Sequence, residues 1–386
     1  MFDRQVTTRF LQSLEHIRHG ALTVTLPDGK IRHFEGPEPG AEAVLILHDW
    51  RVIGAALRRG DIALAECYRD GLWDSPDPTR LFEFGMQNQA ALDSYICGGA
   101  FGRIAARMAY LFTRNTVRGS KKNIHAHYDL GNEFYALWLD QTMTYSSALF
   151  DEGEDTLFDA QHRKYDRIID RVGPSGRLLE IGCGWGGFAE RAVQRGDYDF
   201  KGLTISKAQH EFASNRVGKE AVIALEDYRY QKGRYDQIVS IEMFEAVGEK
   251  FWPLYFDKLK SLLAGKGKAL VQTITISDDA FDQYRRGGDA IRTFIFPGGM
   301  LPSPEKFRAA SAKAGLQVTD AFAFGPDYAR TLTHWLDNFE AQLDEVRALG
   351  FDEPFIRLWR FYLTSCIAAF RHGRTDVMQW ELRHAS

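Results

Sequence analysis

The ten residues LLEIGCGWGG, Leu178–Gly187, decide the fold of this chain. An apolar run passes through Glu180 and ends at Ile181, and a glycine-rich turn then leads into GFAERAVQR, a pattern typical of a helix. Glycine at such a turn permits a positive φ and lets a ligand approach the backbone closely. The stretch therefore predicts a strand, a nucleotide-binding loop and a helix.

Around this stretch, strand and helix patterns alternate along the chain. The alternation predicts the α/β class, with a doubly wound, mostly parallel sheet that binds its ligand at the carboxyl ends of the strands. The segment 302–386 is expected to add helices and one or two strands. Strands are expected at 177–182, 199–205, 221–226, 235–241 and 268–276, and helices at 157–172, 187–195, 206–216 and 252–264.

The surroundings of the loop favour S-adenosylmethionine over a dinucleotide as the ligand. A dinucleotide fold places an acid about twenty residues beyond the glycines, at the end of the second strand, where it binds the ribose hydroxyls. That end reads Leu203-Thr204-Ile205-Ser206 and has no acid. Glu180 would repel a pyrophosphate, whereas it suits the sulfonium and ammonium groups of S-adenosylmethionine.

The first ninety residues predict a small α+β unit. A helix pattern ends near Gly20, two short strands flank Pro27-Asp28-Gly29, and AVLILHD (43–49) is typical of a buried strand. The order of these elements weakly resembles a lipid-carrier domain. We therefore expect three parts, namely a lipid-carrier-like α+β domain at 1–93, a basic linker or helical segment at 94–125 and a catalytic domain at 126–386.

The segment between these domains is basic. Residues 94–128 contain no Asp or Glu but carry six Lys or Arg residues among aromatic ones. One interpretation is an amphipathic segment that lies on an anionic membrane surface. The other is a solvated linker helix whose basic residues pair with acids elsewhere.

Composition excludes several classes of protein. The 386 residues carry 48 Lys and Arg against 52 Asp and Glu, a net charge of −4, so no attraction to nucleic acid is expected. No apolar run reaches the roughly 18–20 residues of a spanning helix, and the start MFDRQVTTRF does not resemble a signal peptide.

Four separated cysteines indicate a reducing cytoplasm. His125 and His127 lack partners at ligand spacing, so no metal site is expected.

Six motifs follow one another in the order found in a known family. They are HYDLGNEFYALWLDQTMTYSSALF (127–150), LEIGCGWGGFA (179–189), GLTISKAQ (202–209), IVSIEMFEAVG (238–248), FIFPGGMLPS (294–303) and FGPDYARTL (324–332). Together they resemble the cyclopropane-fatty-acyl-phospholipid synthases and the related mycolic acid methyltransferases, strongly over 120–386 and weakly over 70–84. The resemblance implies the seven-stranded, Rossmann-like sheet of class I methyltransferases.

The resemblance also implies which residues hold S-adenosylmethionine. Gly182, Cys183 and Gly184 would lie against its methionine part, and Tyr145 and Ser146 belong to a segment that closes over the methionine carboxylate. The positions that match contacts to the ribose, the adenosine side and the adenine are Thr204, Ile205, Gln209 and either Glu226 or Asp227.

In this family the methyl group moves onto a cis double bond of a phospholipid acyl chain, and a bound bicarbonate accepts a proton. The resemblance places the anion-holding glutamate at Glu245, the tyrosine at Tyr328 and a backbone contact at Ile274. Two positions depart from the family pattern. Ser147 stands where the family has a cysteine, and Gln272 stands where it has a histidine. Neither side chain offers the proton chemistry of thiol or imidazole near neutral pH. It stays open whether bicarbonate is bound or Glu245 itself is the base.

The expected function is S-adenosylmethionine-dependent methyl transfer to unsaturated acyl chains of membrane phospholipids, through a carbocation, giving a cyclopropane fatty acid. The altered anion site leaves open a methyl-branched, methylene-branched or furan-precursor product. Phe244, Trp252, Phe294 and Phe296 are candidates for stabilising the cation, and each is otherwise an ordinary core residue.

Two other classes of function stay open. One is a lipid- and cofactor-binding protein without catalysis, and the other is a methyltransferase that acts on nitrogen or oxygen of a small molecule. The expected partner is a phospholipid bilayer, met by a cytoplasmic protein at the inner membrane surface. The resemblance leaves room for a homodimer.

Overall fold

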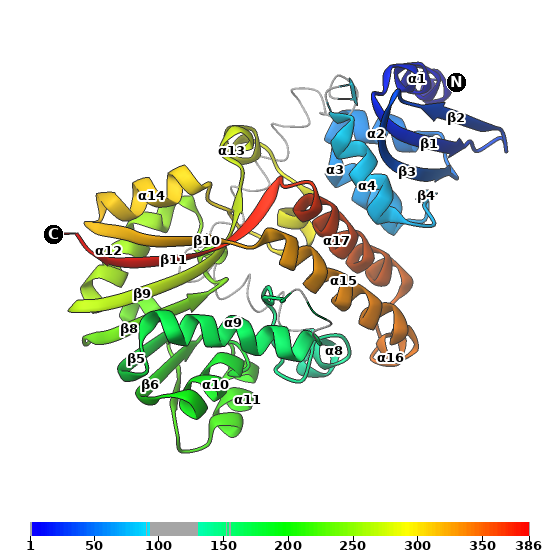
Figure 1. Cartoon of the computed structure of the whole chain (residues 1–386). Coiled ribbons are helices and arrows are strands. Elements are labelled where there is room, and N and C mark those ends of the chain that lie inside the picture. Colours follow the sequence, from blue (N-terminus) through cyan, green and yellow to red (C-terminus); the bar gives the residue numbers. More distant parts are fainter. Residues whose placement is uncertain (1, 90, 93–129, 152, 154–155, 386) are drawn as a thin grey trace. The chain divides into compact units, whose positions relative to one another are not determined.

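A computed structural model describes residues 2–89, 91–92, 130–151, 153 and 156–385 of the chain (Figure 1). Its elements form two compact units, each with a sheet of its own. The described residues of the first unit lie within Met1–Thr113, Asp282–Pro297 and Glu340–Arg374, and those of the second lie within Arg114–Phe281, Gly298–Phe339 and Thr375–Ser386.

The expected domain boundaries after residues 93 and 125, and the basic segment 94–125 itself, lie outside the described residues. The three-part division therefore stays a prediction.

The second unit is built on a seven-stranded sheet with the order β10-β11-β9-β8-β5-β6-β7. Strands β5 to β9 run parallel, and β11 is antiparallel to both of its neighbours. The predicted doubly wound, mostly parallel sheet is confirmed, and its chain order reverses beside β5. The strands are β5 (Ser175–Ile181), β6 (Asp197–Thr204), β7 (Val222–Leu225), β8 (Tyr235–Ile241), β9 (Leu263–Ile276), β10 (Leu316–Ala323) and β11 (Thr375–His384).

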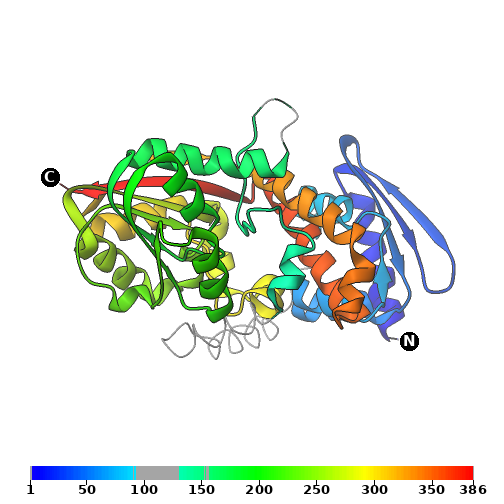
Figure 2. The same ribbon diagram turned by 90° about the horizontal axis from the view of Figure 1, so that it is seen from below.

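Helices cover both faces of this sheet (Figures 1 and 2). Helices α9, α10 and α11 pack together on one face, and α12 and α14 pack together on the other. The helices in this part of the chain are α8 (Asn132–Ala136), α9 (Leu157–Val172), α10 (Gly187–Arg195), α11 (Lys207–Val217), α12 (Trp252–Leu262), α13 (Asp278–Arg286), α14 (Pro304–Lys313) and α15 (Gly325–Ala341).

Local sequence signals begin two of these helices at the expected places. Thr156 and Ser206 are the N-caps of α9 and α11, and their hydroxyls accept hydrogen bonds from the N–H groups of Asp159 and Gln209. Helix α9 coincides with the predicted helix 157–172. Strand β9 begins earlier than predicted, at Leu263.

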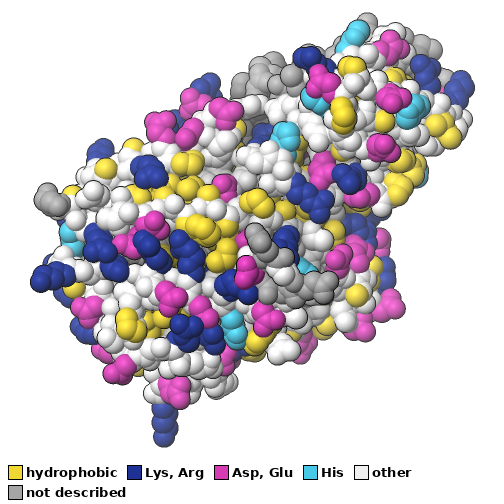
Figure 3. All heavy atoms as spheres, in the orientation of Figure 1, with side chains coloured by type: hydrophobic (Ala, Val, Ile, Leu, Met, Phe, Trp, Pro, Cys, Tyr) yellow, Lys and Arg dark blue, Asp and Glu magenta, His cyan; other side chains and the backbone are white. Residues whose placement is uncertain are grey.

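Basic side chains cross one face of this unit, in a row over α9, β10 and β11 (Figure 3). Arg171 of α9 pairs with Asp320 of β10 at 3.2 Å and with Glu381 of β11 at 2.9 Å. Arg383 also pairs with Glu381, at 3.0 Å. These ion pairs connect the last two strands to the helix layer.

The first unit has a four-stranded sheet with the order β2-β1-β3-β4. The predicted hairpin is formed by β1 and β2, and β3 pairs parallel with β1. The elements are α1 (Phe2–Ser13), β1 (His19–Thr25), β2 (Ile31–Glu35), β3 (Glu38–Leu47), α2 (Arg51–Arg59), α3 (Asp61–Arg69), β4 (Trp73–Asp74), α4 (Pro78–Gln87), α16 (Leu343–Ala348) and α17 (Glu353–Arg371).

A C-terminal helix completes the core of this first unit. Helix α17 packs against α3 and α4, and its Phe361 belongs to the same buried cluster as Trp73 and Phe84. The guanidinium of Arg357 pairs with Asp74 at 2.7 Å and donates to the carbonyl of Trp73 at 2.9 Å. The sequence did not predict this packing, since the helices expected in 302–386 were assigned to the catalytic domain.

Candidate active site

The glycine loop lies at the carboxyl edge of the seven-stranded sheet, beside the point where the chain order reverses. Gly182 has a φ of +84°, and a Cβ atom there would lie 2.9 Å from Cγ of Met243. Gly184 has a φ of +52°, and a Cβ atom there would meet nothing within 4 Å. A close approach therefore requires glycine at 182, and the backbone at 184 borders open space that a ligand can fill.

Cys183 between these glycines is a buried structural residue. The N–H groups of Gly182 and Cys183 both donate to the carbonyl of Leu203 at 2.9 Å, which ties the loop to the end of β6. Burial raises the pKa of the Cys183 thiol well above its usual value. A protonated, buried thiol is a poor nucleophile, so this cysteine fits the loop rather than attacking a substrate.

Glu180 is a buried carboxylate near the end of β5. It is 2% exposed, and its Oε2 atom has no hydrogen-bond partner among the described residues. Burial raises the pKa of Glu180 to about 8, and the charge of Lys164 opposes this shift only in part. An acid without a partner in an apolar setting suits a cationic ligand group.

Lys164, on the buried face of α9, places a positive charge near this acid. Its Nζ donates to Oγ of Ser146 at 2.7 Å. Burial lowers the pKa of Lys164 to about 7, against the attraction of Glu242, Asp140 and Glu180. The sequence reasoning missed this residue, although a lone lysine within the apolar face of a predicted helix was a visible signal.

The residues expected at the ribose and adenine lie at the neighbouring strand ends. The Thr204 hydroxyl donates to Oε1 of Gln209 at 2.9 Å, and the N–H of Glu226 donates to the Thr204 carbonyl at 2.9 Å. Asp227 caps the turn after β7, and Ile205 follows β6 directly. The structure thus brings this predicted set together at the edge that carries the glycine loop.

Three hydrogen-bond donors converge on the carboxylate of Glu242, directly after β8. The Ser147 N–H and Nε2 of Gln272 donate to Oε1 at 2.9 and 2.8 Å, and the Tyr328 hydroxyl donates to Oε2 at 2.6 Å. Ser147 contributes its backbone, because its hydroxyl donates to the carbonyl of the next residue. Burial raises the pKa of Glu242, and these hydrogen bonds and Lys164 oppose the shift.

Hydrogen bonding also fixes which way the Gln272 amide faces. The guanidinium of Arg167 can only donate, and it donates to Oε1 of Gln379. The Gln379 amide nitrogen therefore donates to Oε1 of Gln272, at 3.0 Å. The Gln272 amide nitrogen is left facing Glu242 as a donor, so this chain of contacts prepares a position for a negative charge.

Glu245 has different surroundings, although it lies only three residues from Glu242. Its Oε1 accepts hydrogen bonds from the Ile274 N–H at 2.5 Å and the Thr273 hydroxyl at 2.9 Å. Its Oε2 is buried and has no partner in the described part of the chain. Burial and the nearby charge of Glu242 raise the pKa of Glu245 to about 8.

The predicted set of anion-holding residues is therefore divided between two carboxylates. The Ile274 N–H donates to Glu245, whereas Ser147, Gln272 and Tyr328 donate to Glu242. The sequence reasoning missed Glu242. An acid at the carboxyl end of a predicted parallel strand was the signal that pointed to it.

A cluster of aromatic rings connects the glycine loop with Tyr328. The Tyr145 ring lies 5.3 Å from that of Trp335 and 5.5 Å from that of Tyr135, measured between centroids. Tyr135 is 5.0 Å from Trp185 of the loop, and Trp335 is 6.0 Å from Tyr328. These faces offer apolar surroundings that favour a cation.

Two of the aromatic residues expected at the cation, Phe244 and Trp252, belong to a buried core. Phe244 is fully buried and stacks on Trp252 at 5.6 Å, within a core of further aromatic rings. Phe294 and Phe296 belong to the first unit, where Phe296 lies 5.8 Å from Tyr362. Phe244 and Trp252 are core residues.

Two observations concern metals and membranes. His125 and His127 lie outside the described residues, and within the described ones no group of His, Cys, Asp and Glu is arranged to hold a metal ion. No helix in the part of the chain that the structure covers has the length and apolar character needed to cross a bilayer.

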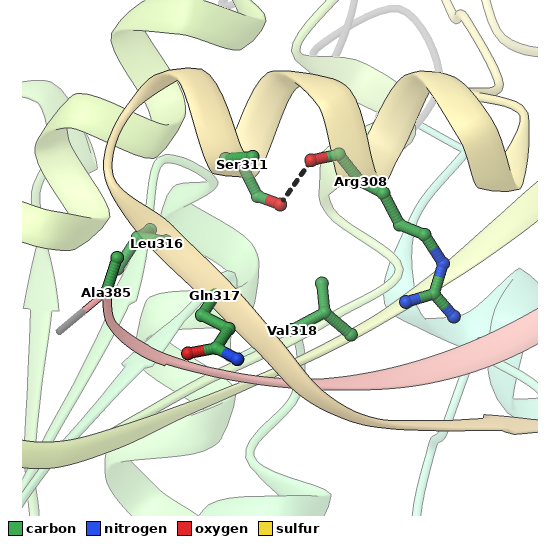
Figure 4. Close-up of a pocket in the computed structure, with 7 residues that line it drawn as sticks. Arg308, Ser311, Leu316, Gln317, Val318 and Ala385 are labelled. Carbon is green, nitrogen blue, oxygen red and sulfur yellow. Dashed lines mark hydrogen bonds between the residues drawn. The ribbon is translucent and has the colours of Figure 1, made fainter.

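A separate, open pocket of about 360 Å³ lies beside α14 and β10 (Figure 4). Arg308, Ser311, Leu316 and Gln317 are among its lining residues, and the Ser311 hydroxyl donates to the Arg308 carbonyl at 3.0 Å. The lining includes none of the carboxylates or loop glycines described above. This pocket is not part of the candidate site.

Known proteins resemble this chain in sequence and in structure. The family described as mycolic acid cyclopropane synthetase matches residues 115–380. The tuberculostearic acid methyltransferase UfaA1 of Mycobacterium tuberculosis is 36% identical over 351 residues, which are 84% of this chain and 79% of that protein. The cyclopropane-fatty-acyl-phospholipid synthase of Escherichia coli K12 is 34% identical over 84% of this chain and 83% of its own. The crystal structure of mycolic acid cyclopropane synthase CmaA1 complexed with SAH and CTAB superposes with a TM-score of 0.63 at 34% identity, over 68% of this chain and 97% of that one.

Proposed function

The chain belongs to the mycolic acid cyclopropane synthetase family and is an S-adenosylmethionine-dependent methyltransferase, and from this premise we propose that it methylates the double bond of an unsaturated fatty acyl chain in a membrane phospholipid. The observation that carries the proposal is the aromatic cluster between Trp185 and Tyr328, with Glu242 bound to that tyrosine. An alkene is a weak, uncharged nucleophile. Its methylation needs positioning, exclusion of water and stabilisation of a developing cation.

The described residues fit S-adenosylmethionine. Glu180 offers a buried carboxylate oxygen without a partner, and Gly184 leaves open space at the loop. Both are expected to hold the methionine part, with Tyr145 and Ser146 closing over it. Bound there, the cofactor would supply an electrophilic methyl group on a sulfonium.

The residues of the chain then act on the acyl substrate. The aromatic faces of Tyr145 and Trp335 would exclude water and stabilise the carbocation that methyl transfer leaves on the chain. A neighbouring carboxylate would take the proton. The first candidate product is a cyclopropane, in which that proton comes from the added methyl group.

A second candidate product is a methyl- or methylene-branched chain. The observation that favours it is the altered anion site, where the Ser147 hydroxyl turns to a backbone carbonyl and Gln272 stands in place of a histidine. A base in a different position removes a different proton from the cation. If a hydride first shifts along the chain, the later loss of a proton gives a branched product. One relative in the comparison is named for a tuberculostearic acid product, which supports the same alternative.

A single experiment separates these products. The protein is incubated with phospholipid vesicles that contain a cis-unsaturated chain and with a trideuteromethyl donor, and the acyl chains are analysed by mass spectrometry. A cyclopropane retains two donor deuteriums, and a methyl branch retains three when the lost proton comes from the chain. A methylene branch also retains two, but ozone cleaves its alkene and leaves a ring intact.

The same experiment tests the reaction class. The absence of labelled acyl chains, with normal cofactor binding, would support a lipid- and cofactor-binding protein without catalysis. Label on a small nitrogen or oxygen acceptor in a lipid-free screen would support a small-molecule methyltransferase. Labelled phospholipid contradicts the non-catalytic alternative.

We also propose that the protein acts at the cytoplasmic face of the membrane as a peripheral protein, and that a homodimer is its assembly. The acid-free sequence 94–128 supports the first proposal, because basic residues are attracted to anionic lipid. Sedimentation with anionic and neutral vesicles tests it. Light scattering of the purified protein tests the second.

A further inference from the structure

The contacts of Glu242 are those of a bound anion, but they are made by the chain itself. Its two oxygens accept three hydrogen bonds, from the Ser147 N–H, the Gln272 amide and the Tyr328 hydroxyl. These are three of the residues expected to surround an external bicarbonate. A carboxylate and a bicarbonate present the same pair of acceptor oxygens.

The donors are organised for negative charge independently of Glu242. A backbone N–H can only donate, and the sequence Arg167, Gln379, Gln272 turns the amide nitrogen of Gln272 toward the same place. Ser147 and Gln272 are fully buried, so an unfilled position would leave donors without acceptors. The site requires a hydrogen-bond acceptor, and the Glu242 carboxylate supplies it.

The backbone of Glu242 is held in an unfavourable conformation. Its φ of +48° lies in the left-handed region, which glycine adopts freely and a glutamate rarely does. Such strain persists where the surrounding structure holds a side chain at a functional position. This observation is independent of the hydrogen bonds.

We propose that Glu242 is a catalytic carboxylate that takes the place of an external anion and accepts the proton lost from the methylated acyl cation. This inference rests on the proposed methyl transfer. It assigns the base to a side chain of the protein, so that bicarbonate is not required.

The proposed step is balanced. The alkene π pair forms the bond to the methyl group, while the sulfonium keeps the pair of its broken S–C bond. A C–H bond then breaks. If it belongs to the added methyl group, its electron pair closes the ring onto the cationic carbon; if it belongs to a chain carbon next to the cation, its electron pair forms a new double bond. The proton forms an O–H bond with Glu242, which later releases it to water.

The test compares the parent with Glu242→Gly in buffer freed of carbon dioxide, using vesicles with cis-unsaturated chains. We expect parent activity to be unchanged by added bicarbonate. Glu242→Gly tolerates the backbone angle and should lose roughly 100-fold in rate, as when a general base is removed. Added bicarbonate or formate should raise the rate of Glu242→Gly at least about tenfold, because a small anion enters the vacated position.

Two further variants serve as controls. Glu242→Gln keeps the shape of the side chain, so we expect it to lose activity, to bind the cofactor normally and to resist rescue, since its amide fills the position. Glu305→Gln changes an exposed glutamate on α14 and should leave both activity and anion response unchanged. Rescue of Glu242→Gly alone identifies the carboxylate as the missing group.

A binding measurement separates this inference from the proposed function. Carbon-13-labelled formate should bind to Glu242→Gly and not to the parent, as followed by NMR line broadening, whatever the substrate is. If the parent transfers no methyl group to lipid, the proposed function fails while this measurement still decides the anion position. A parent that requires bicarbonate, a fully active Glu242→Gly in anion-free buffer, or a Glu242→Gly that neither binds formate nor regains activity overturns the inference.

Discussion

At the scale of single residues, Glu242 and Glu245 differ in how well hydrogen bonds stabilise a negative charge on each. Glu242 receives three hydrogen bonds, whereas one oxygen of Glu245 receives none. The pKa of Glu245 is raised to about 8 by burial and by the charge of Glu242. Near neutral pH, Glu245 is therefore mainly protonated, and Glu242 is the better-stabilised anion.

Replacing Glu245 by Gln should change how stability depends on pH. The Glu245 carboxyl has a pKa near 4.5 in the unfolded chain and about 8 in the folded state. It therefore does not destabilise the folded state below pH 4.5, and it destabilises that state increasingly as the pH rises to 8. Glu245→Gln removes this titration. The stability of the variant relative to the parent should rise between pH 5 and 8, by up to about 1.4 kcal/mol per pH unit.

Urea unfolding at several pH values measures this difference. Glu305→Gln, which changes an exposed glutamate on α14, serves as the control. A parent and a Glu245→Gln variant with parallel pH profiles would contradict the assigned protonation state.

Replacing Glu180 by Gln should remove a proton release that accompanies cofactor binding. The pKa of Glu180 is raised to about 8, so the carboxyl is mostly protonated at pH 7, and a cationic ligand favours its ionised form. Calorimetry in buffers of different ionisation enthalpy should show proton release for the parent and none for the variant. We also expect affinity to fall roughly tenfold, as for a lost charged hydrogen bond.

S-adenosylhomocysteine provides the comparison for this measurement. It lacks the sulfonium charge and should release fewer protons from the parent than S-adenosylmethionine does. Equal proton release by the parent and by Glu180→Gln would show that another group titrates.

At the scale of elements, α9, β11 and β9 act together on the anion position. Arg167 of α9 and Gln379 of β11 turn the Gln272 amide of β9 toward Glu242. Gln379→Leu removes this orientation without touching the carboxylate. We expect a lower kcat with an unchanged cofactor affinity, measured by steady-state kinetics and calorimetry.

Gln317→Leu on β10 is the matched control, because Gln317 is exposed and lines the separate pocket. It should retain parent kinetics. If Gln379→Leu behaves in the same way, the orientation of Gln272 does not matter to the reaction.

The sequence predicted the elements better than the contacts between them. Apolar periodicity and the cap residues Thr156 and Ser206 are local signals, so α9, α11 and the parallel strands could be placed. The hydrogen-bond partner of Tyr328 could not be predicted. Glu242 and Glu245 are only three residues apart, and the conformation of the turn after β8 decides which carboxylate faces Tyr328. The positive φ of Glu242 that makes this turn has no local sequence signal.

At the scale of the whole molecule, each unit depends on segments that are distant in the sequence. The first unit needs Arg357 of α17 to bind the segment around Asp74. Arg357→Ala should lower the melting transition of that unit by roughly 2–4 °C for each kcal/mol lost. Saturating cofactor should stabilise only the other unit, by about 2.7 kcal/mol at a hundredfold excess over Kd. The melting temperature of that unit alone should therefore rise.

Differential scanning calorimetry checks this prediction, with Arg347→Ala on α16 as the control because Arg347 is half-exposed and pairs with exposed acids. A single transition that moves with both the substitution and the cofactor would show that the two units unfold together.

The last strand of the chain, β11, lies inside its sheet between β9 and β10, and α17 directly precedes it. During synthesis on the ribosome, the first unit cannot finish folding until α17 emerges, nor the second until β11 emerges. Until then β9 and β10 have unpaired edges, which are prone to pair with other chains. A truncation that removes both α17 and β11 would therefore leave both units incomplete.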